Sequence, residues 1–145
     1  MKVEDEPVVV EQRFSCTAAE LWSAITNVDK MRVWYFAEIP EFEPQLDFEV
    51  QFSIESGGRD FLHLWTVTEV RPLSLIRYRW RYEGYSGDSI VTFLLCEEGA
   101  ETTLKVSTEI REDFSEDIPE FARDSCVAGW NFLIKESLNG YLSQA

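Results

Sequence analysis

Residues 117–145 read DIPEFARDSCVAGWNFLIKESLNGYLSQA, and they predict one long C-terminal helix. At roughly 100° per residue, the large apolar side chains fall on one narrow arc, and polar side chains fall largely opposite. Pro119 suits the first turn, where its missing N–H costs nothing. We therefore expect a helix from Asp117 onward that buries an aromatic stripe. The stripe carries Val127, Trp130, Ile134, Leu138 and Tyr141, and the polar side carries Ser125, Lys135, Glu136 and Asn139.

Such a stripe needs an apolar surface of similar length, and the preceding sequence supplies one in a run of predicted strands. From Gln45 to Glu55, apolar residues (Leu46 to Ile54) alternate with polar ones, which is typical of a strand with one buried face. Short turns separate the strands, which favours antiparallel hairpins. The predicted strand over 61–70 has apolar side chains at both odd and even positions, so its pattern does not show which face points inward. Further strands are predicted over 7–14, 75–83, 89–96 and 103–110.

Two short helices are predicted between the first strand and the second. Thr17 and Glu20 form the spacing of a capping box at the start of the first helix. Residues 29–34 are expected to form the second helix. The order is thus β-αα-βββββ-α over a single domain of residues 1–145, which indicates an α+β fold rather than a doubly wound sheet. We expect a curved antiparallel sheet of about six strands wrapped around the long C-terminal helix.

The bulk composition excludes several classes of protein. The net charge is −14, so the basic footprint required for nucleic acid or anionic lipid is missing. The acidic surface either only makes copies of the protein repel one another or contains an acidic patch for a basic partner.

Cys16, Cys96 and Cys126 have no CxxC or metal-finger spacing, which favours free thiols in a reducing compartment. Without a signal-peptide run or eighteen consecutive apolar residues, we expect a cytoplasmic protein with no membrane span.

The inward side chains are unusually bulky, since aromatic residues make up 14% of the chain. Large stiff rings are hard to interdigitate completely, and Trp and Tyr have polar tips that need partners when buried. Ligand pockets are typically lined in this way. A plain aromatic core remains the alternative at this point. The expected lining of a cavity between helix and sheet comprises Trp34, Phe36, Phe48, Phe52, His63, Trp65, Tyr78, Trp80, Thr108, Trp130 and Ile134.

An ordered series of motifs resembles the START-like superfamily, also called SRPBCC or Bet v 1-like. The series is FSCTAAELWSAIT (14–26), VW (33–34), EVRP (69–72), YRW (78–80) and GW (129–130), followed by Ile134, Leu138, Tyr141 and Leu142. It is most similar to the branch named for homologues of the heat-shock-protein-90 ATPase activator. Many relatives have proline at or next to Thr17, which here changes only the helix cap. The resemblance implies the helix-grip fold, with an apolar tunnel between helix and sheet.

Sequence features for catalysis or metal binding are sparse, and no catalytic residue, metal site or cofactor is assigned. His63 could orient a ligand or act as a general base if it faces inward, but we favour a strand histidine bonded to a neighbour. Arg77, Arg79 and Arg81 lie on one strand face, where pairing with acidic residues of neighbouring strands is expected. A specific anion site there is the alternative.

Two residues of the long helix stand apart from its stripe. Gly129 costs about 1 kcal/mol relative to Ala within a helix, which suggests close backbone approach or a bend beside Trp130. Phe132 lies opposite the stripe, where it could contact loops or the second subunit of a homodimer, or remain a single exposed ring.

Three functions fit this sequence, and they belong to different classes. The first is a binding protein for a small hydrophobic or aromatic molecule held under the helix. The second is a cyclase-type enzyme that uses the same cavity, with His63, Tyr78, Tyr82 and Thr108 as candidate polar groups. The third, implied by the resemblance, is a chaperone cofactor or protein-interaction module. We favour binding over catalysis, and the chaperone partner ranks third because fold does not fix function.

Overall fold

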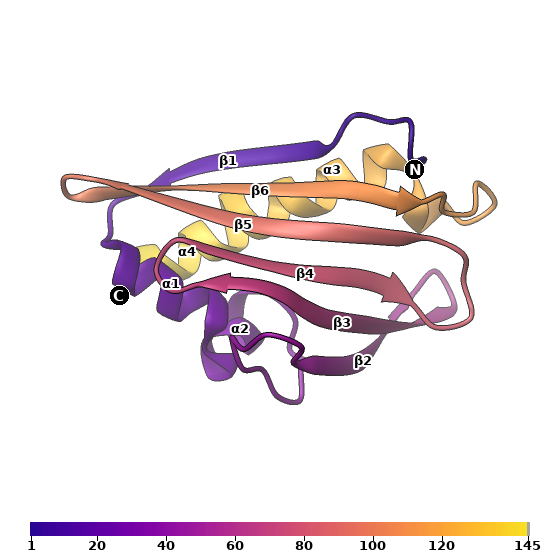
Figure 1. Cartoon of the computed structure of the whole chain (residues 1–145), viewed down its shortest axis with the longest axis horizontal. Helices are drawn as coiled ribbons and strands as arrows, with labels where there is room; N and C mark the ends of the chain where they lie inside the picture. Colours follow the sequence, from indigo (N-terminus) through magenta and orange to yellow (C-terminus); the bar gives the residue numbers. More distant parts are fainter. Residues whose placement is uncertain (145) are drawn as a thin grey trace.

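The computed structural model describes residues 1–144, and its architecture is a curved six-stranded sheet with all helices on one face (Figure 1). The order β-αα-βββββ-α predicted from the sequence is confirmed, and the fold is α+β of the helix-grip type. The strands are β1 (Val8–Phe14), β2 (Glu49–Ser56), β3 (Arg59–Arg71), β4 (Leu75–Tyr82), β5 (Asp88–Glu98) and β6 (Glu101–Glu112). The helical elements are α1 (Ala18–Thr26), α2 (Val28–Trp34), the 3₁₀ turn η1 (Pro119–Phe121), α3 (Arg123–Asn131), the π-helical segment η2 (Phe132–Leu138) and α4 (Asn139–Ser143).

The sheet is antiparallel throughout, with the strand order β1-β6-β5-β4-β3-β2. The five strands from β2 to β6 pair consecutively through hairpins. The first strand, β1, pairs with the last, β6, for example Val10 opposite Val106. The inward face of β3 is settled by the structure: Phe61, His63, Trp65 and Val67 are buried. No helix within residues 1–144 has both the length and the apolar character needed to cross a membrane.

The long helix begins later than the sequence pattern predicts. Ala122 is extended (φ −71°, ψ 147°), so the continuous helical run starts at Arg123, and Pro119 begins the separate turn η1. The reason lies in Phe121, which is buried and stacks on Tyr82 with ring centroids 5.0 Å apart. Burying this ring requires the chain to leave the helical path before α3, so the prediction of one helix from Asp117 was wrong at its start.

From Arg123 the helix continues to Ser143 and buries the centre of the expected stripe. Trp130, Ile134 and Leu138 are buried, Val127 and Tyr141 at its ends are only partly buried, and Lys135 and Glu136 are exposed. These buried residues are spaced strictly by four, and an α-helix would rotate such a series steadily away from the sheet. The π-helical turns of η2 are wider and rotate less per residue, which compensates for that drift. The π segment therefore keeps all three side chains against the strands.

The clearest predicted strand also begins later than expected. Leu46 is 64% exposed, and β2 starts at Glu49. Asp47 has a φ of 67°, a left-handed conformation that turns the chain and interrupts the alternation. At the start of α1, the Glu20 N–H donates to Thr17 Oγ1 (3.1 Å). The Thr17 hydroxyl in turn donates to the Glu20 carboxylate, so this cap lacks the backbone return bond of a full capping box.

Two of the three arginines on β4 have the structural role expected for the row, whereas Arg81 has no ion pair within residues 1–144. Arg77 Nη1 lies 2.9 Å from Glu69 Oε1, and Arg79 Nε lies 2.9 Å from Asp88 Oδ2. Both pairs link neighbouring strands, and both arginines are substantially exposed to solvent. Such exposed pairs contribute at most about 1 kcal/mol each, so they assist sheet pairing without defining a binding site.

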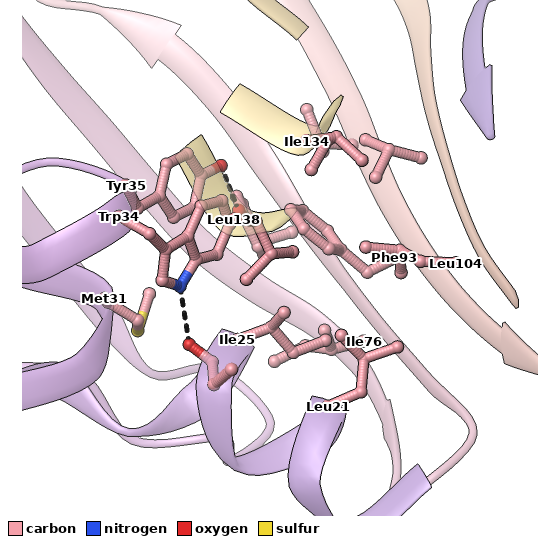
Figure 2. Close-up of a cluster of buried hydrophobic side chains, with 14 of the residues drawn as sticks. Leu21, Ile25, Met31, Trp34, Tyr35, Ile76, Phe93, Leu104, Ile134 and Leu138 are labelled. Carbon is pink, nitrogen blue, oxygen red and sulfur yellow. Dashed lines mark hydrogen bonds between the residues drawn. The ribbon is translucent and has the colours of Figure 1, made fainter. Parts of the chain in front are cut away.

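Trp34 joins the two short helices to the C-terminal helix (Figure 2). Its indole Nε1 donates to the Ala24 carbonyl at the end of α1 (2.7 Å), and its own carbonyl accepts from Ser137 Oγ (2.6 Å). The indole also stacks on Tyr35, with centroids 4.6 Å apart. Figure 2 shows this pair beside Met31 and Leu138, so one residue connects three helical elements within the core.

Candidate ligand-binding cavity

The main apolar core and a smaller second cluster are separated by a cavity of about 400 Å³. Trp130 and Val91 line the cavity on the side of the main core, and Phe114 and Phe121 line it on the side of the second cluster. The helix α3 covers it, and Figure 1 shows α3 behind the β1–β6 side of the sheet. This volume lies within the range of about 300–1,000 Å³ usual for small-molecule sites.

The structure divides the residues expected to line a cavity into two groups. Five of them line it together: Phe36, His63, Trp80, Thr108 and Trp130. The others lie outside it. Trp34, Phe52, Trp65, Tyr78 and Ile134 are buried in the main core, and Phe48 packs against its edge.

Tyr35 explains why the cavity lies toward one end of the sheet. Its ring packs 5.3 Å from that of Trp65 and 6.1 Å from those of Phe93 and Trp130, measured between centroids. The space above Trp65 is therefore filled by the residue that follows α2. Figure 1 shows that α1 and α2 lie against this part of the sheet only and do not reach its opposite end. The cavity forms there, between Tyr35 and the second cluster.

Several lining residues were not predicted from the sequence to face a cavity. Phe114 lies two residues after the end of β6 and Phe121 ends η1, and both rings are buried. Cys126 adds a half-buried thiol from α3. The one available signal was the presence of isolated aromatic residues in otherwise acidic segments, since such rings seldom remain in water.

The polar atoms around the cavity are mostly satisfied within the protein. Trp130 Nε1 donates to Thr108 Oγ1 (2.9 Å), and Ser89 Oγ donates to the Trp80 carbonyl (2.8 Å). Glu120 Oε2 accepts from Ser56 Oγ (2.9 Å). Trp80 Nε1 is buried and has no hydrogen-bond partner among residues 1–144. The surface offered to a ligand is therefore mainly aromatic, with few polar groups to orient it.

His63 is buried at the wall of the cavity. Its Nδ1 lies 2.9 Å from the Phe61 carbonyl, which can only accept, so Nδ1 carries the hydrogen. The ring stacks on Phe52, with centroids 4.9 Å apart. Burial among these rings lowers its pKa from 6.5 to about 4, since the charged form loses its hydration. At neutral pH, His63 is therefore an uncharged imidazole whose Nε2 can accept a hydrogen bond.

This pKa makes folding stability depend on pH. Between pH 6.5 and 4 the unfolded chain binds more protons at His63 than the folded chain, so acid favours unfolding. We expect the contribution of His63 to the free energy of unfolding to fall by about 2 kcal/mol from pH 8 to pH 5. Urea titrations of the wild type and of His63→Phe across this range measure it as a difference, which also cancels other titrating groups. Identical pH profiles for the two proteins would contradict the buried neutral histidine.

Tyr35 and Tyr78 share a hydrogen bond in the dry core beside the cavity. Their hydroxyl oxygens lie 2.6 Å apart, and Figure 2 draws this bond as a dashed line at the Tyr35 hydroxyl. Burial raises the pKa of both phenols, so both are neutral. Removing one hydroxyl leaves the other buried without a partner. We expect Tyr35→Phe and Tyr78→Phe each to cost about 1–3 kcal/mol.

The double variant tests this pair, because it leaves neither hydroxyl unsatisfied. We expect its loss of unfolding free energy to be clearly smaller than the sum of the two single losses. Denaturant unfolding of the four proteins in this double-mutant cycle gives the coupling energy. Simple additivity would show that the two hydroxyls do not depend on each other.

Within residues 1–144, no group of three or more His, Cys, Asp or Glu side chains is arranged to hold a metal ion. Cys16, Cys96 and Cys126 are all free thiols.

A long C-terminal helix held against a curved antiparallel sheet, with an apolar cavity between them, defines the START-like class of helix-grip proteins. The chain belongs to the family described as "Activator of Hsp90 ATPase homolog 1-like protein", whose family model matches residues 15–143. Curated proteins gave no match to this chain.

Solved structures with the same fold are numerous but distant in sequence. Protein CV1439 from Chromobacterium violaceum is 18% identical, with a TM-score of 0.78, and the match covers 94% of this chain and 96% of that one. The Aha1 dimer from Colwellia psychrerythraea is 12% identical, with a TM-score of 0.70 and coverage of 95% and 96%. DynU16, from the dynemicin biosynthetic locus, is 20% identical with a TM-score of 0.76; the match covers 96% of this chain and 48% of DynU16. At these identities the likeness concerns the fold alone.

Proposed function

We propose that this protein binds a small hydrophobic or aromatic molecule in the cavity between the C-terminal helix and the sheet. The observation that carries the proposal is the cavity of about 400 Å³ with its aromatic lining. Rings such as Trp80, Trp130 and Phe121 offer flat apolar surfaces, and burying apolar ligand area against them contributes roughly 25 cal/mol per Å². A closely packed interior would instead leave few voids larger than a water molecule.

The polar groups of the cavity suit an uncharged or weakly polar ligand. His63 is neutral and offers an acceptor, while the Thr108 hydroxyl, which already accepts from Trp130, can still donate. Within residues 1–144, no lysine or arginine side chain lines the cavity, whereas the Glu120 carboxylate does, and the Met1 ammonium is already bonded to the Phe121 carbonyl (3.0 Å). These charges favour a neutral ligand over an anionic one. A few oriented polar groups in an apolar pocket typically fix the direction in which a ligand binds.

Fluorescence titration with the uncharged probe N-phenyl-1-naphthylamine tests this function. We expect saturable binding of one probe per chain and energy transfer from Trp80 and Trp130, which line the cavity. Trp130→Phe keeps the apolar wall but removes one donor, so it should reduce the transfer more than it reduces the affinity. Non-saturable fluorescence, or transfer unchanged by this substitution, would place the probe elsewhere on the protein.

A cyclase-type enzyme in the same cavity is the second candidate. Three of its four proposed polar residues, His63, Tyr82 and Thr108, line the cavity together, whereas Tyr78 is in the core bonded to Tyr35. With a pKa of about 4, His63 is a weak general base, which favours binding over catalysis. An activity that His63→Phe leaves unchanged would remove the principal residue of the enzyme hypothesis.

Family membership supports a protein-partner role as a third candidate. We put forward a chaperone partner with a basic surface, since the net charge of −14 would attract it, and a homodimer by likeness to the Aha1 dimer. Affinity for a basic partner should fall steeply with salt. Light scattering of the purified protein determines the oligomeric state.

The three free thiols support a reducing cytoplasmic location.

A further inference from the structure

We propose that Gly129 is the mouth of the cavity, where the missing side chain leaves the opening through which an apolar ligand enters and leaves. The inference rests on the proposed binding function and adds the route and its controlling residue. It starts from the burial of the cavity lining. The lining residues that are exposed are Ser125, Gly129 and Phe132, and they follow one another at helical spacing along α3 and the start of η2.

The space beside Gly129 is open. A Cβ atom built at this position would meet no atom within 4 Å, although the residue lines the cavity. Close backbone approach, which the sequence suggested as one reason for this glycine, is therefore wrong. The backbone does not require glycine either, because the residue lies within the regular helix α3 and has no positive φ. In this position glycine destabilises the helix relative to Ala, so something other than the helix favours it.

The neighbours of Gly129 fit a mouth for apolar molecules. Phe132 lines the cavity, yet its ring is 55% exposed, so the rim carries an apolar surface that an entering ligand can contact. Cys126 lies one helical turn before Gly129 and is half-buried in the cavity wall. Any side chain at 129 would project beside the opening that leads to Cys126.

The chain contains a matched control for this proposal. Gly140 is also an exposed helical glycine, in α4, and a Cβ there likewise meets nothing within 4 Å. It does not line the cavity. Substitutions at 129 and 140 should therefore have similar effects on helix stability, and only those at 129 should affect access.

Alkylation of Cys126 by N-ethylmaleimide, followed by peptide mass spectrometry, measures access without any ligand. The exposed Cys96 serves as the internal reference for reagent activity. We expect Gly129→Leu to slow Cys126 alkylation at least tenfold and Gly129→Ala to slow it less, while Gly140→Leu leaves it unchanged. Cys96 should react equally in all four proteins. If Gly129→Leu fails to fold by circular dichroism, the comparison of Gly129→Ala with Gly140→Ala decides.

Two results would overturn the proposal: Cys126 alkylation in the 129 variants within twofold of the wild type, or a wild-type Cys126 as unreactive as the buried Cys16. Stopped-flow exchange of N-phenyl-1-naphthylamine separates this failure from failure of the proposed function. If the probe binds and exchanges equally fast with Gly129→Leu, the function stands and the mouth lies elsewhere. If the wild type does not bind the probe while Cys126 access depends on residue 129, the opening stands and the ligand proposal fails.

Discussion

Replacement of Trp34 by Ala is expected to lower the free energy of unfolding by about 3–5 kcal/mol, the usual cost of deleting a buried aromatic side chain. Only 2% of Trp34 is exposed, and its indole N–H satisfies the Ala24 carbonyl, which the substitution would leave without its donor. The lost ring would also remove the stacking partner of Tyr35. Because Trp34 connects α1, α2 and η2, we expect the whole domain to unfold more readily rather than one helix to fray.

Urea unfolding, followed by circular dichroism, gives this difference in free energy. Val33→Ala is the matched control, since Val33 is the preceding residue of α2 and is 67% exposed. A surface substitution of this kind should change stability by no more than about 0.5 kcal/mol. If Trp34→Ala and Val33→Ala were equally stable, the docking of α2 described above would be incorrect.

Replacement of Val91 by Phe is expected to weaken binding of N-phenyl-1-naphthylamine at least tenfold, or about 1.4 kcal/mol. Val91 is buried on β5 and lines the cavity, so a larger ring at this position would project into the space that the probe needs. At about 400 Å³, the cavity lies near the lower end of the usual range, and one added ring is a substantial loss. The protein itself should lose little stability, because the ring enters space that no protein side chain occupies.

Val67→Phe provides the control for this second prediction. Val67 is equally buried, on β3, but it does not line the cavity. Adding a ring to a packed core typically costs about 1–3 kcal/mol. We therefore expect Val67→Phe to lower stability and retain probe binding, whereas Val91→Phe does the reverse. Calorimetric titration and urea unfolding of both variants give the two quantities, and equal behaviour of the pair would mean that no cavity lies beside Val91.

The fold was predictable from the sequence because its signals are local. Alternation on β2, the capping residues at Thr17 and the stripe through Trp130 and Leu138 each reflect a period that can be counted along the chain. The errors occurred where tertiary contacts override that period. Phe121 leaves the helical path to join the second cluster, and Asp47 turns the chain before β2.

The position of the cavity was less predictable, for a physical reason. Tyr78 faces inward as its strand position suggests, and Trp65 faces inward on a strand whose pattern left this open, but the Tyr35 ring packs against both. Whether an aromatic ring fills a space or borders a cavity depends on how separate helices and strands pack together. This packing cannot be derived from the periodicity of a single sequence. The same holds for Phe114, whose burial comes from the second cluster and not from any pattern in its own segment.

Native mass spectrometry of the protein purified from its own cells tests the central claim most directly. The account predicts one bound small molecule per chain in the wild type, with the bound fraction strongly reduced in Val91→Phe and retained in Val67→Phe. A wild-type protein that carries no small molecule and takes up no apolar probe when saturated with it would contradict the claim that this cavity is a binding site.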